Sequence, residues 1–503
     1  MAPGCFSVEK GRVAVIGAGV SGVATVKELR KRGIDCLAFE KQSKVGGLWA
    51  DNYYKAGAQE TKKLYRFIDL EHKEEVADYP DKDEICEYLD NVVDELNLRA
   101  YFRFNHEVLQ MEQNEDMRWS ITVKDMKLSE SRTEVFDFLV ICTGLFSGKP
   151  NVPTFPGQDK FEGEIMHTSK WRSPDLFKGK KVVVVGNGKS ALDVAVNASE
   201  NAESVVQVSR HRQWMTHNTI GVFPAFKILS SRLFGKLLAP YYGDSELSKA
   251  LHRIASPFSW VYFRLLEAML LTNYRLPPRL WPKSKFNEDL LSSSICLVPK
   301  PYLQAVRRGA IDVRVGGINE IGRKSLRLST GEEVDADVII LGTGWKRSVK
   351  PLNDDLLKRL KAEKDGIWVY KHIISPNVEN FAFIGHASSF MNPVTFDLQA
   401  RWLVGWLCED FKKPSKKEME QDVENMKKSR RGLINECEHR AGFVQLQQAA
   451  YHDDLLTDMG MNPKRNAGIL GWIEHYLSPH DPVLLKKALD QGTAMSFHEK
   501  ELC

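Results

Sequence analysis

The stretch RVAVIGAGVSGVATVKELRKRGIDCLAFE, residues 12–40, decides the fold of this chain. A short apolar run leads into GAGVSG at 17–22, and a helix-compatible stretch then ends at Gly33 before a second apolar run that closes on Glu40. This order predicts a strand, a glycine turn, a helix and a second strand. It is the opening of a parallel α/β unit.

The GxGxxG spacing between a strand and a helix predicts a dinucleotide-binding turn. Gly17 permits the tight turn, Gly19 lets the backbone approach a pyrophosphate, and Gly22 allows the helix to pack closely on the sheet. The helix N-terminus stabilises phosphates, and the Glu40 carboxylate can accept hydrogen bonds from ribose hydroxyls. A purely structural glycine turn is the alternative, and the flanking strand, helix and acid disfavour it.

A second opening of the same kind lies at 179–209, where GNGKSA follows the apolar run VVVV and Ala191 takes the place of the third glycine. The strand after it ends on Arg210, His211 and Arg212 instead of an acid. Guanidinium groups at this point suit the 2′-phosphate of a ribose, so NADPH is favoured over NAD. The alternative is a solvated basic strand end.

The composition places the chain among large folded globular proteins. It has 503 residues, of which 43% are hydrophobic and 27% are charged, and this length predicts two or three domains. Seventy Lys and Arg against 66 Asp and Glu leave a net charge of +4, too small for a general nucleic-acid binder. Eight cysteines without a CxxC pair disfavour zinc ribbons and favour a reduced compartment, hence a cytoplasmic location.

Nothing in the sequence predicts secretion or a membrane span. The opening MAPGCFSVEKGR lacks the length and the cleavage pattern of a signal peptide. Charged residues interrupt the most apolar tract, 223–274, so no uncharged stretch reaches the ~18 to 20 residues of a spanning helix. Peripheral association with an intracellular membrane through amphipathic helices of this tract stays open, as does a homodimer.

Two dinucleotide sites in a chain without a CxxC pair imply a flavoprotein supplied with electrons by a nicotinamide cofactor. We therefore predict FAD and NADPH as cofactors. The Pro- and Gly-rich stretch at 147–158 marks a connection between domains. The fold class is α/β with two Rossmann-like domains: a discontinuous FAD-binding domain over 1–175 and 335–503, and an NADPH-binding domain over 176–334 that carries a helical insert at about 214–300.

Further motifs give the chain a resemblance to the flavin-containing monooxygenase family, in family order from about residue 12 to 465. They are GAGVSG with Glu40, GGLW at 46–49, FEGEIMHTSKW at 161–171, GNGKSA followed by RHR, LGTGW at 341–345 and LQARW at 398–402. The soluble, plant-like members are the most similar. The resemblance implies an enzyme that reduces FAD with NADPH, forms a C4a-hydroperoxyflavin with O₂ and oxygenates a nitrogen or sulfur atom of a small nucleophilic substrate.

The resemblance also implies roles for individual residues. Gln59 and His167 are the candidate catalytic residues, with Gln59 beside the flavin and the nicotinamide and His167 at the interface of the two domains. Leu48 and Trp49 are expected near the flavin. The predicted cofactor-binding residues are Gly17, Ala18, Gly19, Val20, Ser21, Gly22, Glu40, Lys41, Gly47, Leu48, Trp49, Gln59, Glu60, Val108, Thr143, Gly144, Gly186, Gly188, Ser190, Ala191, Leu192, Asp193, Arg210, Arg212 and Gly344.

Two departures from the family pattern leave the reaction type open. Gln59 stands where vertebrate members have an Asn, although an amide is retained. Trp171 followed by Arg172 matches neither the branch that oxidises nitrogen and sulfur, which carries Tyr or Phe, nor the Baeyer-Villiger branch, which carries Trp before Pro or Asp. The alternatives are a Baeyer-Villiger monooxygenase acting on ketones, an uncoupled NADPH oxidase, and a catalytically silent cofactor-binding protein.

No metal site is expected. His452, Asp453 and Asp454 in YHDDLL are adjacent in sequence, and adjacent positions on a helix do not share a face. We expect these three residues on a solvated surface.

Overall fold

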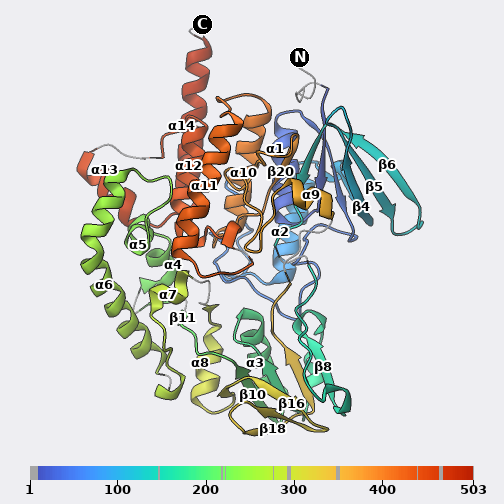
Figure 1. The fold of residues 1–503 in the computed structure, drawn as a ribbon, viewed down its shortest axis with the longest axis vertical. Coiled ribbons are helices and arrows are strands. Elements are labelled where there is room, and N and C mark those ends of the chain that lie inside the picture. Colours follow the sequence, from blue (N-terminus) through green and yellow to red (C-terminus); the bar gives the residue numbers. More distant parts are fainter. Residues whose placement is uncertain are drawn as a thin grey trace.

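The computed structural model describes residues 10–145, 148–216, 219–220, 223–275, 277–291, 296–346, 352–438, 440–463 and 468–501. The first nine residues, which carry part of the prediction that the chain has no signal peptide, lie outside the described residues. Figure 1 shows two α/β units stacked along the long axis of the molecule, with a helical flank on the left. The predicted α/β class with two parallel sheets is confirmed.

The first sheet has the strand order β20-β7-β1-β2-β3, and all of its neighbouring strands are parallel. The predicted strand, turn, helix and strand over 12–40 form as β1, α1 and β2. The sheet strands and the first helix are β1 (Arg12–Ile16), α1 (Val20–Lys31), β2 (Asp35–Glu40), β3 (Phe102–Phe104), β7 (Phe138–Ile141) and β20 (Phe381–Phe383). Parallel strands covered on both faces read as continuous apolar runs, and β7 is buried at every position.

The second sheet has the order β15-β10-β9-β19-β8, again with parallel neighbours. Its elements are β8 (Glu164–His167), β9 (Lys181–Val185), α3 (Lys189–Asn201), β10 (Ser204–Ser209), α8 (Lys300–Arg307), β15 (Asp312–Val315) and β19 (Val338–Leu341). The sheet is therefore wider than the predicted range 176–334, because β8 and β19 join it from outside that range. These two strands are paired neighbours, and they carry the chain into and out of the unit.

Two segments that connect the units run side by side. The amide of Asn151 donates to the carbonyl of Gly344 at 2.8 Å, and the amide of Lys346 donates to the carbonyl of Lys149 at 2.8 Å. Trp345 pairs with Pro150 as an isolated antiparallel bridge. Backbone hydrogen bonds thus hold together the segments 149–151 and 344–346, which we call the paired link.

Each unit also carries a three-stranded antiparallel sheet. The alternating runs EVLQMEQ at 107–113 and RWSITV at 118–123 are typical of a short antiparallel pair. They form β4 (His106–Gln113) and β5 (Trp119–Asp125), and a third strand, β6 (Ser131–Phe136), extends the pair. The sequence analysis missed β6 because its residues are mostly exposed and lack an apolar alternation. The second unit carries β16 (Ile318–Ile321), β17 (Ser325–Leu328) and β18 (Glu333–Asp335).

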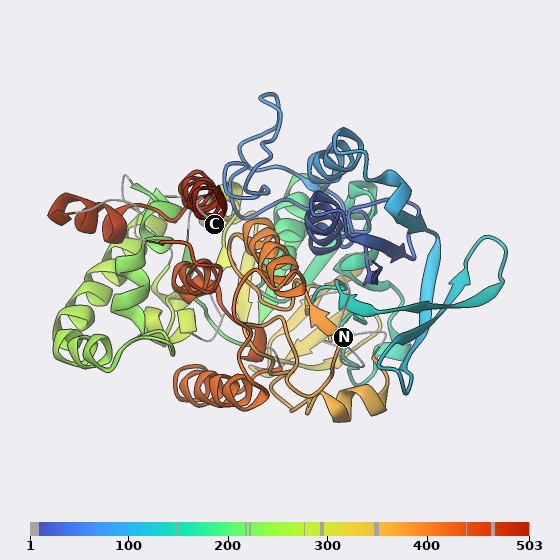
Figure 2. The same ribbon diagram turned by 90° about the horizontal axis from the view of Figure 1, so that it is seen from above.

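Helices build the left flank and the upper part of the molecule (Figures 1 and 2). The insert contributes β11 (Met215–Thr216), β12 (Thr219–Ile220), β13 (Phe223–Pro224), α4 (Ala225–Leu229), α5 (Arg232–Leu238), α6 (Glu246–Tyr274), α7 (Phe286–Leu291) and β14 (Cys296–Leu297). The other helices are α2 (Lys82–Glu95), α9 (Asp354–Arg359), α10 (Asn392–Leu407), α11 (Lys416–Leu433), α12 (Gln448–Asp458), α13 (Gly468–Leu477) and α14 (Pro482–Glu501). The long helix α6 forms the outer edge in both views.

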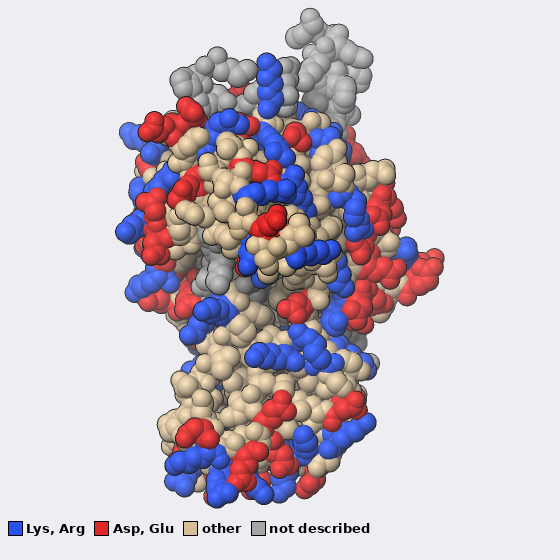
Figure 3. Space-filling view, turned by 90° about the vertical axis from the view of Figure 1, so that its right-hand side faces the viewer, with Lys and Arg blue, Asp and Glu red and all other residues tan. Residues whose placement is uncertain are grey.

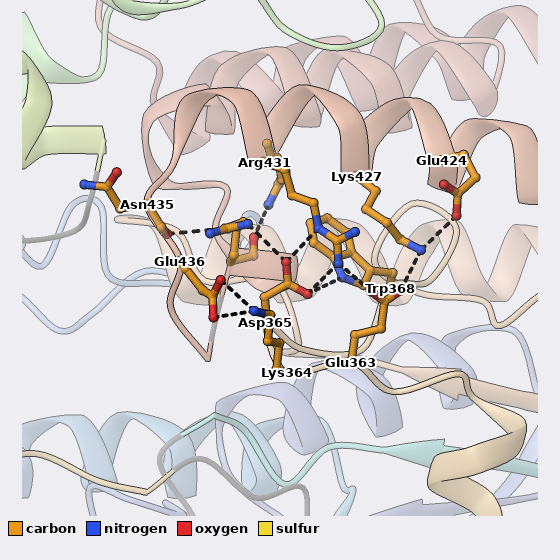
Figure 4. Close-up of polar contacts among 11 residues, drawn as sticks. Glu363, Lys364, Asp365, Trp368, Glu424, Lys427, Arg431, Asn435 and Glu436 are labelled. Atoms are coloured by element: carbon orange, nitrogen blue, oxygen red, sulfur yellow. Dashed lines mark hydrogen bonds and ion pairs between the residues drawn. The ribbon is translucent and has the colours of Figure 1, made fainter.

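A buried carboxylate holds α11 against the segment between α9 and β20. Asp365 is 1% exposed and accepts hydrogen bonds from Arg431 at 2.9 Å and from Arg440 at 3.2 Å. Its other oxygen accepts from the indole of Trp368 at 3.1 Å (Figure 4). Burial alone would raise the pKa of Asp365, but its bonds to Arg431 and Trp368 lower it. The cluster has satisfied partners and serves packing.

A second buried charge cluster joins α1 to α10. Asp397 is fully buried, lies 2.7 Å from the Lys27 ammonium and 3.6 Å from the Arg401 guanidinium, and accepts the amide of Ile68 at 2.9 Å. Burial alone would raise the pKa of Asp397, but the two cations overcome this effect and lower it to about 2. The carboxylate thus fixes the helix that follows the first glycine turn.

We expect Asp397→Asn to lower the free energy of unfolding by about 3 kcal/mol, because the substitution leaves two buried cations with less compensation. The matched control is Asp410→Asn, which removes the exposed ion pair with Arg32 and costs less than about 1 kcal/mol. Since the pKa of Asp397 is depressed, its contribution is present near neutral pH and is lost as the pH falls toward 2. Urea unfolding of both variants tests this, and equal losses would contradict it.

Candidate functional site

The first glycine turn forms a cradle at the end of β1. Gly17 has a φ of +108°, and a Cβ at this position would lie 2.8 Å from the carbonyl oxygen of Cys142. A Cβ on Gly22 would lie 2.0 Å from the carbonyl oxygen of Gly17. Only glycine therefore fits at both positions, and α1 begins directly against the sheet.

Glu40 holds this cradle in shape. Its buried carboxylate accepts the amide of Ala18 at 2.8 Å and the amide of Gln42 at 2.9 Å. The GGLW loop lies over the start of α1, because the amide of Gly46 donates to the carbonyl of Ala18 at 3.0 Å. A Cβ on Gly47 would lie 2.9 Å from the Cα of Gly19. The two loops thus meet backbone to backbone.

Four further predicted residues follow β7 or belong to the GGLW loop. Thr143 and Gly144 follow β7, and the buried Thr143 hydroxyl has no hydrogen-bond partner in the described part of the chain. Leu48 is 38% exposed, and the Trp49 indole donates to the Tyr65 hydroxyl at 2.6 Å. An open glycine cradle beside an orphaned buried hydroxyl fits a bound dinucleotide.

Two predicted residues have side chains that point elsewhere. Lys41 is exposed, and Val108 packs in the hydrophobic core of the β4–β6 sheet with Ile16 and Phe39. Val108 could therefore take part in binding only through its backbone, and the assignment of both residues stays a prediction.

The second glycine turn forms a matching cradle at the end of β9. Gly186 has a φ of +125°, and a Cβ there would lie 2.3 Å from the carbonyl oxygen of Gly342. Ala191 packs directly against Gly342, where a Cβ would approach its side chain to 2.5 Å. A Cβ on Gly188, in contrast, would meet nothing within 4 Å. The space above Gly188 is open at the N-terminus of α3, where a pyrophosphate is stabilised.

A pocket lies beside this cradle, at the end of β10. It encloses about 400 Å³ of empty space including its open mouth, and the residues that line it are Asn187, Gln207, Ser209, His211, Arg212, Gln213, Met215, Leu280, Tyr302, Val306, Val313 and Val315. The buried Nε of Arg212 has no partner in the described part of the chain. Arg210 is exposed and does not line the pocket. An uncommitted guanidinium N–H in an open pocket fits a phosphate.

The segment 51–60 ties the two units together. The hydroxyl of Tyr53 donates to Asp193 at 2.7 Å, and the Lys189 ammonium lies 2.5 Å from the same carboxylate. Burial raises the pKa of Asp193, and Lys189 and Tyr53 oppose that effect. The start of α3 is therefore bonded to a residue that precedes β3 in the first unit. No local pattern in the sequence marks Tyr53, because its partner is far away in the chain.

Gln59 and Glu60 lie at the end of the same segment, and Glu60 is close enough to Lys189, at the start of α3, for their charges to interact. Burial raises the pKa of Glu60 to about 8, although the Lys189 ammonium opposes the shift. Solvent reaches part of the Glu60 side chain, but protein surrounds the carboxyl group. Glu60 is therefore mostly protonated at neutral pH and can donate a hydrogen bond at the place where the nicotinamide end of a cofactor is expected.

His167 holds the paired link between the units. Its Nδ1 accepts the amide of Ser169 at 3.1 Å, so Nε2 carries the proton and donates to the carbonyl of Gly344 at 3.0 Å. Burial lowers the pKa of His167, against the opposing effect of the Gly344 carbonyl. The imidazole is thus neutral, 3% exposed and committed at both nitrogens, which fits positioning of the link rather than proton transfer.

Trp171 belongs to the same interface. It is 1% exposed, its indole donates to the carbonyl of Ser173 at 2.7 Å, and its ring packs against Tyr54 and Phe177. The next residue, Arg172, lies 2.7 Å from the Asp51 carboxylate. These contacts fasten the segment 51–60 to the second unit.

The expectation that YHDDLL lies on a solvated surface is wrong. His452 is fully buried between Thr395 and His480, with hydrogen bonds of 2.7 Å to each. Asp453 lies 2.6 Å from Arg232, and Asp454 lies 2.7 Å from Lys371. The error arises because α12 packs between α10 and the insert, a contact that the local sequence does not reveal. Within the described residues, no group of three ligating side chains can hold a metal.

The sequence and the structure are similar to flavin monooxygenases. A family model described as "Flavin-binding monooxygenase-like" matches residues 10–471. The chain is 27% identical to the probable flavin-containing monooxygenase 1 of Arabidopsis thaliana, over 93% of this chain and 96% of the relative. It is also 27% identical to human flavin-containing monooxygenase 3, over 90% of this chain and 83% of the relative.

Two solved structures share the fold. S-allyl-L-cysteine S-oxygenase from Allium sativum matches with a TM-score of 0.64 and 19% identity, over 96% of this chain and 99% of that chain. Cyclohexanone monooxygenase from Rhodococcus sp. Phi1, bound to NADP⁺, matches with a TM-score of 0.66 and 20% identity, over 89% of this chain and 97% of that chain.

The elevated pKa of Glu60 predicts a specific dependence of stability on pH. Because the pKa of about 8 exceeds the unfolded value of ~4.3, the native state binds the extra proton and wild-type stability falls as the pH rises between these values. Glu60→Gln removes this fall, so at pH ~9 the variant exceeds wild type by about 1–3 kcal/mol in free energy of unfolding.

At pH ~5, where Glu60 is protonated in the native state but mostly ionised in the unfolded chain, we expect the variant to exceed wild type by only about 1 kcal/mol or less. The exposed Glu75 supplies the matched control, since Glu75→Gln should leave the pH profile of the wild type unchanged. Chemical unfolding of the holoprotein at several pH values measures both. A constant difference between Glu60→Gln and wild type across this range would show that Glu60 does not titrate there.

Proposed function

Since the chain belongs to the flavin-binding monooxygenase-like family, we propose that it oxygenates a nitrogen or sulfur atom of a small nucleophilic substrate. It is a flavin monooxygenase, an oxidoreductase whose cofactors are FAD and NADP(H). The observation that supports the finer proposal is the segment 51–60, which bonds to Asp193 on α3 through Tyr53 and ends on Glu60 beside Lys189.

The residues fit both cofactors. The first cradle, with Gly17, Gly19 and Glu40, would hold FAD, and the second, with Gly188 and Arg212, would hold NADPH. When bound, the flavin supplies hydride acceptance and oxygen activation, which no side chain of the protein supplies. The transfer of an oxygen atom to the substrate, which the family resemblance implies, is part of what we propose.

The protein's part is to position the groups. The start of α3 is held against the segment 51–60 by Tyr53, Asp193 and Lys189. We propose that these contacts keep the distance between the two cradles constant. His167 holds the link between the units in one arrangement through the Gly344 carbonyl. A fixed spacing lets a nicotinamide reach a flavin without reorganisation.

The charges near this place favour oxygenation of a soft nucleophile over Baeyer-Villiger oxygenation. The latter reaction needs a deprotonated oxidant and therefore an available cation beside it. Two cations beside the segment 51–60 already have carboxylate partners, because Lys189 lies 2.5 Å from Asp193 and Arg172 lies 2.7 Å from Asp51. Baeyer-Villiger oxygenation stays the second candidate, because Trp171 occupies the position that carries Trp in that branch.

The similar proteins do not decide between these reactions, since one of the two solved structures is an S-oxygenase and the other is a cyclohexanone monooxygenase. Product analysis decides it. The purified protein is supplied with NADPH, air and either a thioether or a cyclic ketone, and the products are identified by mass spectrometry. We expect a sulfoxide and no lactone. A lactone would overturn the proposal in favour of the second candidate, and peroxide equal to the NADPH consumed would identify an oxidase.

The proposed location is the cytoplasm, consistent with a reduced compartment for cysteines that are free in the described residues. The small-molecule substrate and O₂ are the expected partners.

The different exposure of two arginines predicts unequal roles in NADPH binding. We expect Arg212→Ala to raise the KM for NADPH by about 10- to 100-fold and to leave the KM for NADH nearly unchanged, because a charge-assisted contact to the 2′-phosphate is lost. Arg210→Ala is the matched control, and its effect should stay below about threefold because Arg210 lies outside the pocket. Steady-state reduction kinetics with both nucleotides measure this, and equal effects of the two variants would contradict it.

A further inference from the structure

Helix α6 presents a wide apolar face to solvent. Its large exposed side chains are between 41% and 76% exposed, and they are Leu247, Leu251, Ile254, Phe258, Trp260, Val261, Leu265 and Met269. We call this set the α6 face. Most of its members recur three or four positions apart, so they lie along one side of the helix. A helix of this length and such exposure is unusual on the surface of a protein that meets only water.

The opposite side of α6 is firmly packed on the molecule. Phe263, Leu266 and Leu270 are at most 5% exposed and belong to the core of the second unit. Glu267 lies 2.6 Å from Arg264 and accepts the amide of Phe286 at 2.6 Å. These contacts fix the orientation of α6, and the α6 face therefore stays exposed to solvent.

By length and composition, Glu246–Asn273 is apolar enough to cross a membrane, with a mean hydropathy of 1.2 and only 22% of the window buried. The sequence analysis expected no such helix, because it required a stretch without charge. The packed side argues against a span, since α6 would have to leave the core and expose Phe263 and Leu270. A helix anchored on one side and apolar on the other suits a position in the plane of a membrane surface.

The exposed charges of the insert that have no ion-pair partner among the described residues are positive. Acidic residues of the insert are neutralised, as Glu246 lies 2.9 Å from Lys249 and Glu288 lies 3.3 Å from Lys285. Four exposed cations form no ion pair with a carboxylate in the described part of the chain, and they are Lys227, Arg253, Arg275 and Lys283. They come from α6 itself, from its C-terminal end and from the adjoining segments. The opposite flank of the molecule instead mixes positive and negative side chains (Figure 3).

We propose that the α6 face docks in the plane of an anionic lipid surface. Apolar and aromatic side chains would enter the boundary between headgroups and acyl chains, where Trp and Phe are favoured, and the unpaired cations would meet lipid phosphates and carboxylates. A second copy of this chain is a poorer occupant, because it would bring the same cations into opposition. Helix α13 lies on the same flank in Figures 1 and 2 and adds the exposed Ile473 and Leu477. The inference does not depend on which reaction the enzyme catalyses.

Vesicle flotation with the purified full-length holoprotein tests the proposal. We expect the protein to float with vesicles of equimolar phosphatidylserine and phosphatidylcholine, and to float less with phosphatidylcholine alone. Added NaCl should lower binding to the anionic vesicles, because salt screens the cations. No flotation with the anionic vesicles would overturn the proposal.

Substitutions on two flanks locate the contact. The double variant Ile254→Glu with Phe258→Glu should lower the vesicle-bound fraction about tenfold or more, since charged groups replace the centre of the α6 face. The matched control is Leu128→Glu, a 68% exposed leucine beside β5 on the opposite flank, which should bind as wild type does. Flavin content and melting temperature show that each variant is folded, and exposed positions should leave both unchanged.

Two results would overturn the assignment. One is vesicle binding that the double variant leaves intact. The other is a homodimer, detected by light scattering without lipid, that the double variant dissociates, because this would assign the α6 face to a second copy of the chain.

Discussion

The structure depends on the close approach of α1 to the end of β1. A Cβ on Gly22 would lie 2.0 Å from the Gly17 carbonyl oxygen, so the helix can start against the sheet only with glycine at this position. From that start, α1 runs along α10, and the buried charges of Lys27 and Asp397 fix the pair. The same approach leaves the first cradle open at the helix N-terminus. One steric constraint thus sets the helix, the core beside it and the binding edge.

The second unit repeats this constraint with a difference. Ala191 stands in place of the third glycine and packs against Gly342, so the close approach is made by the helix side chain and not by bare backbone. The segment 51–60 leaves the first unit and bonds to Asp193 on α3. A flavin and a nicotinamide must meet at a fixed distance, and in the proposed function this segment would help to keep that distance.

Local signals in the sequence were sufficient for much of the fold. The glycine turns, Glu40 and Arg212 each act within one strand–turn–helix unit, and their spacing is visible in a short window. Tyr53, Tyr302 and the burial of His452 were not predictable, because each depends on a partner far away in the chain. Tyr302 donates to Gln207 at 2.6 Å inside the pocket, from a helix that no motif marks. The width of the second sheet was missed for the same reason, since β8 and β19 join it from outside the expected range.

The paired link at 149–151 and 344–346 makes the second unit separable in principle. The chain enters and leaves this unit at one place, and the two passages are hydrogen-bonded to each other. A piece of chain whose ends already touch can be exchanged for another of different length without moving the ends of its host. The second unit thus has the connections of an inserted domain. An exchange would still have to keep the contacts that the helical insert makes with the first unit, such as the ion pair between Arg232 and Asp453.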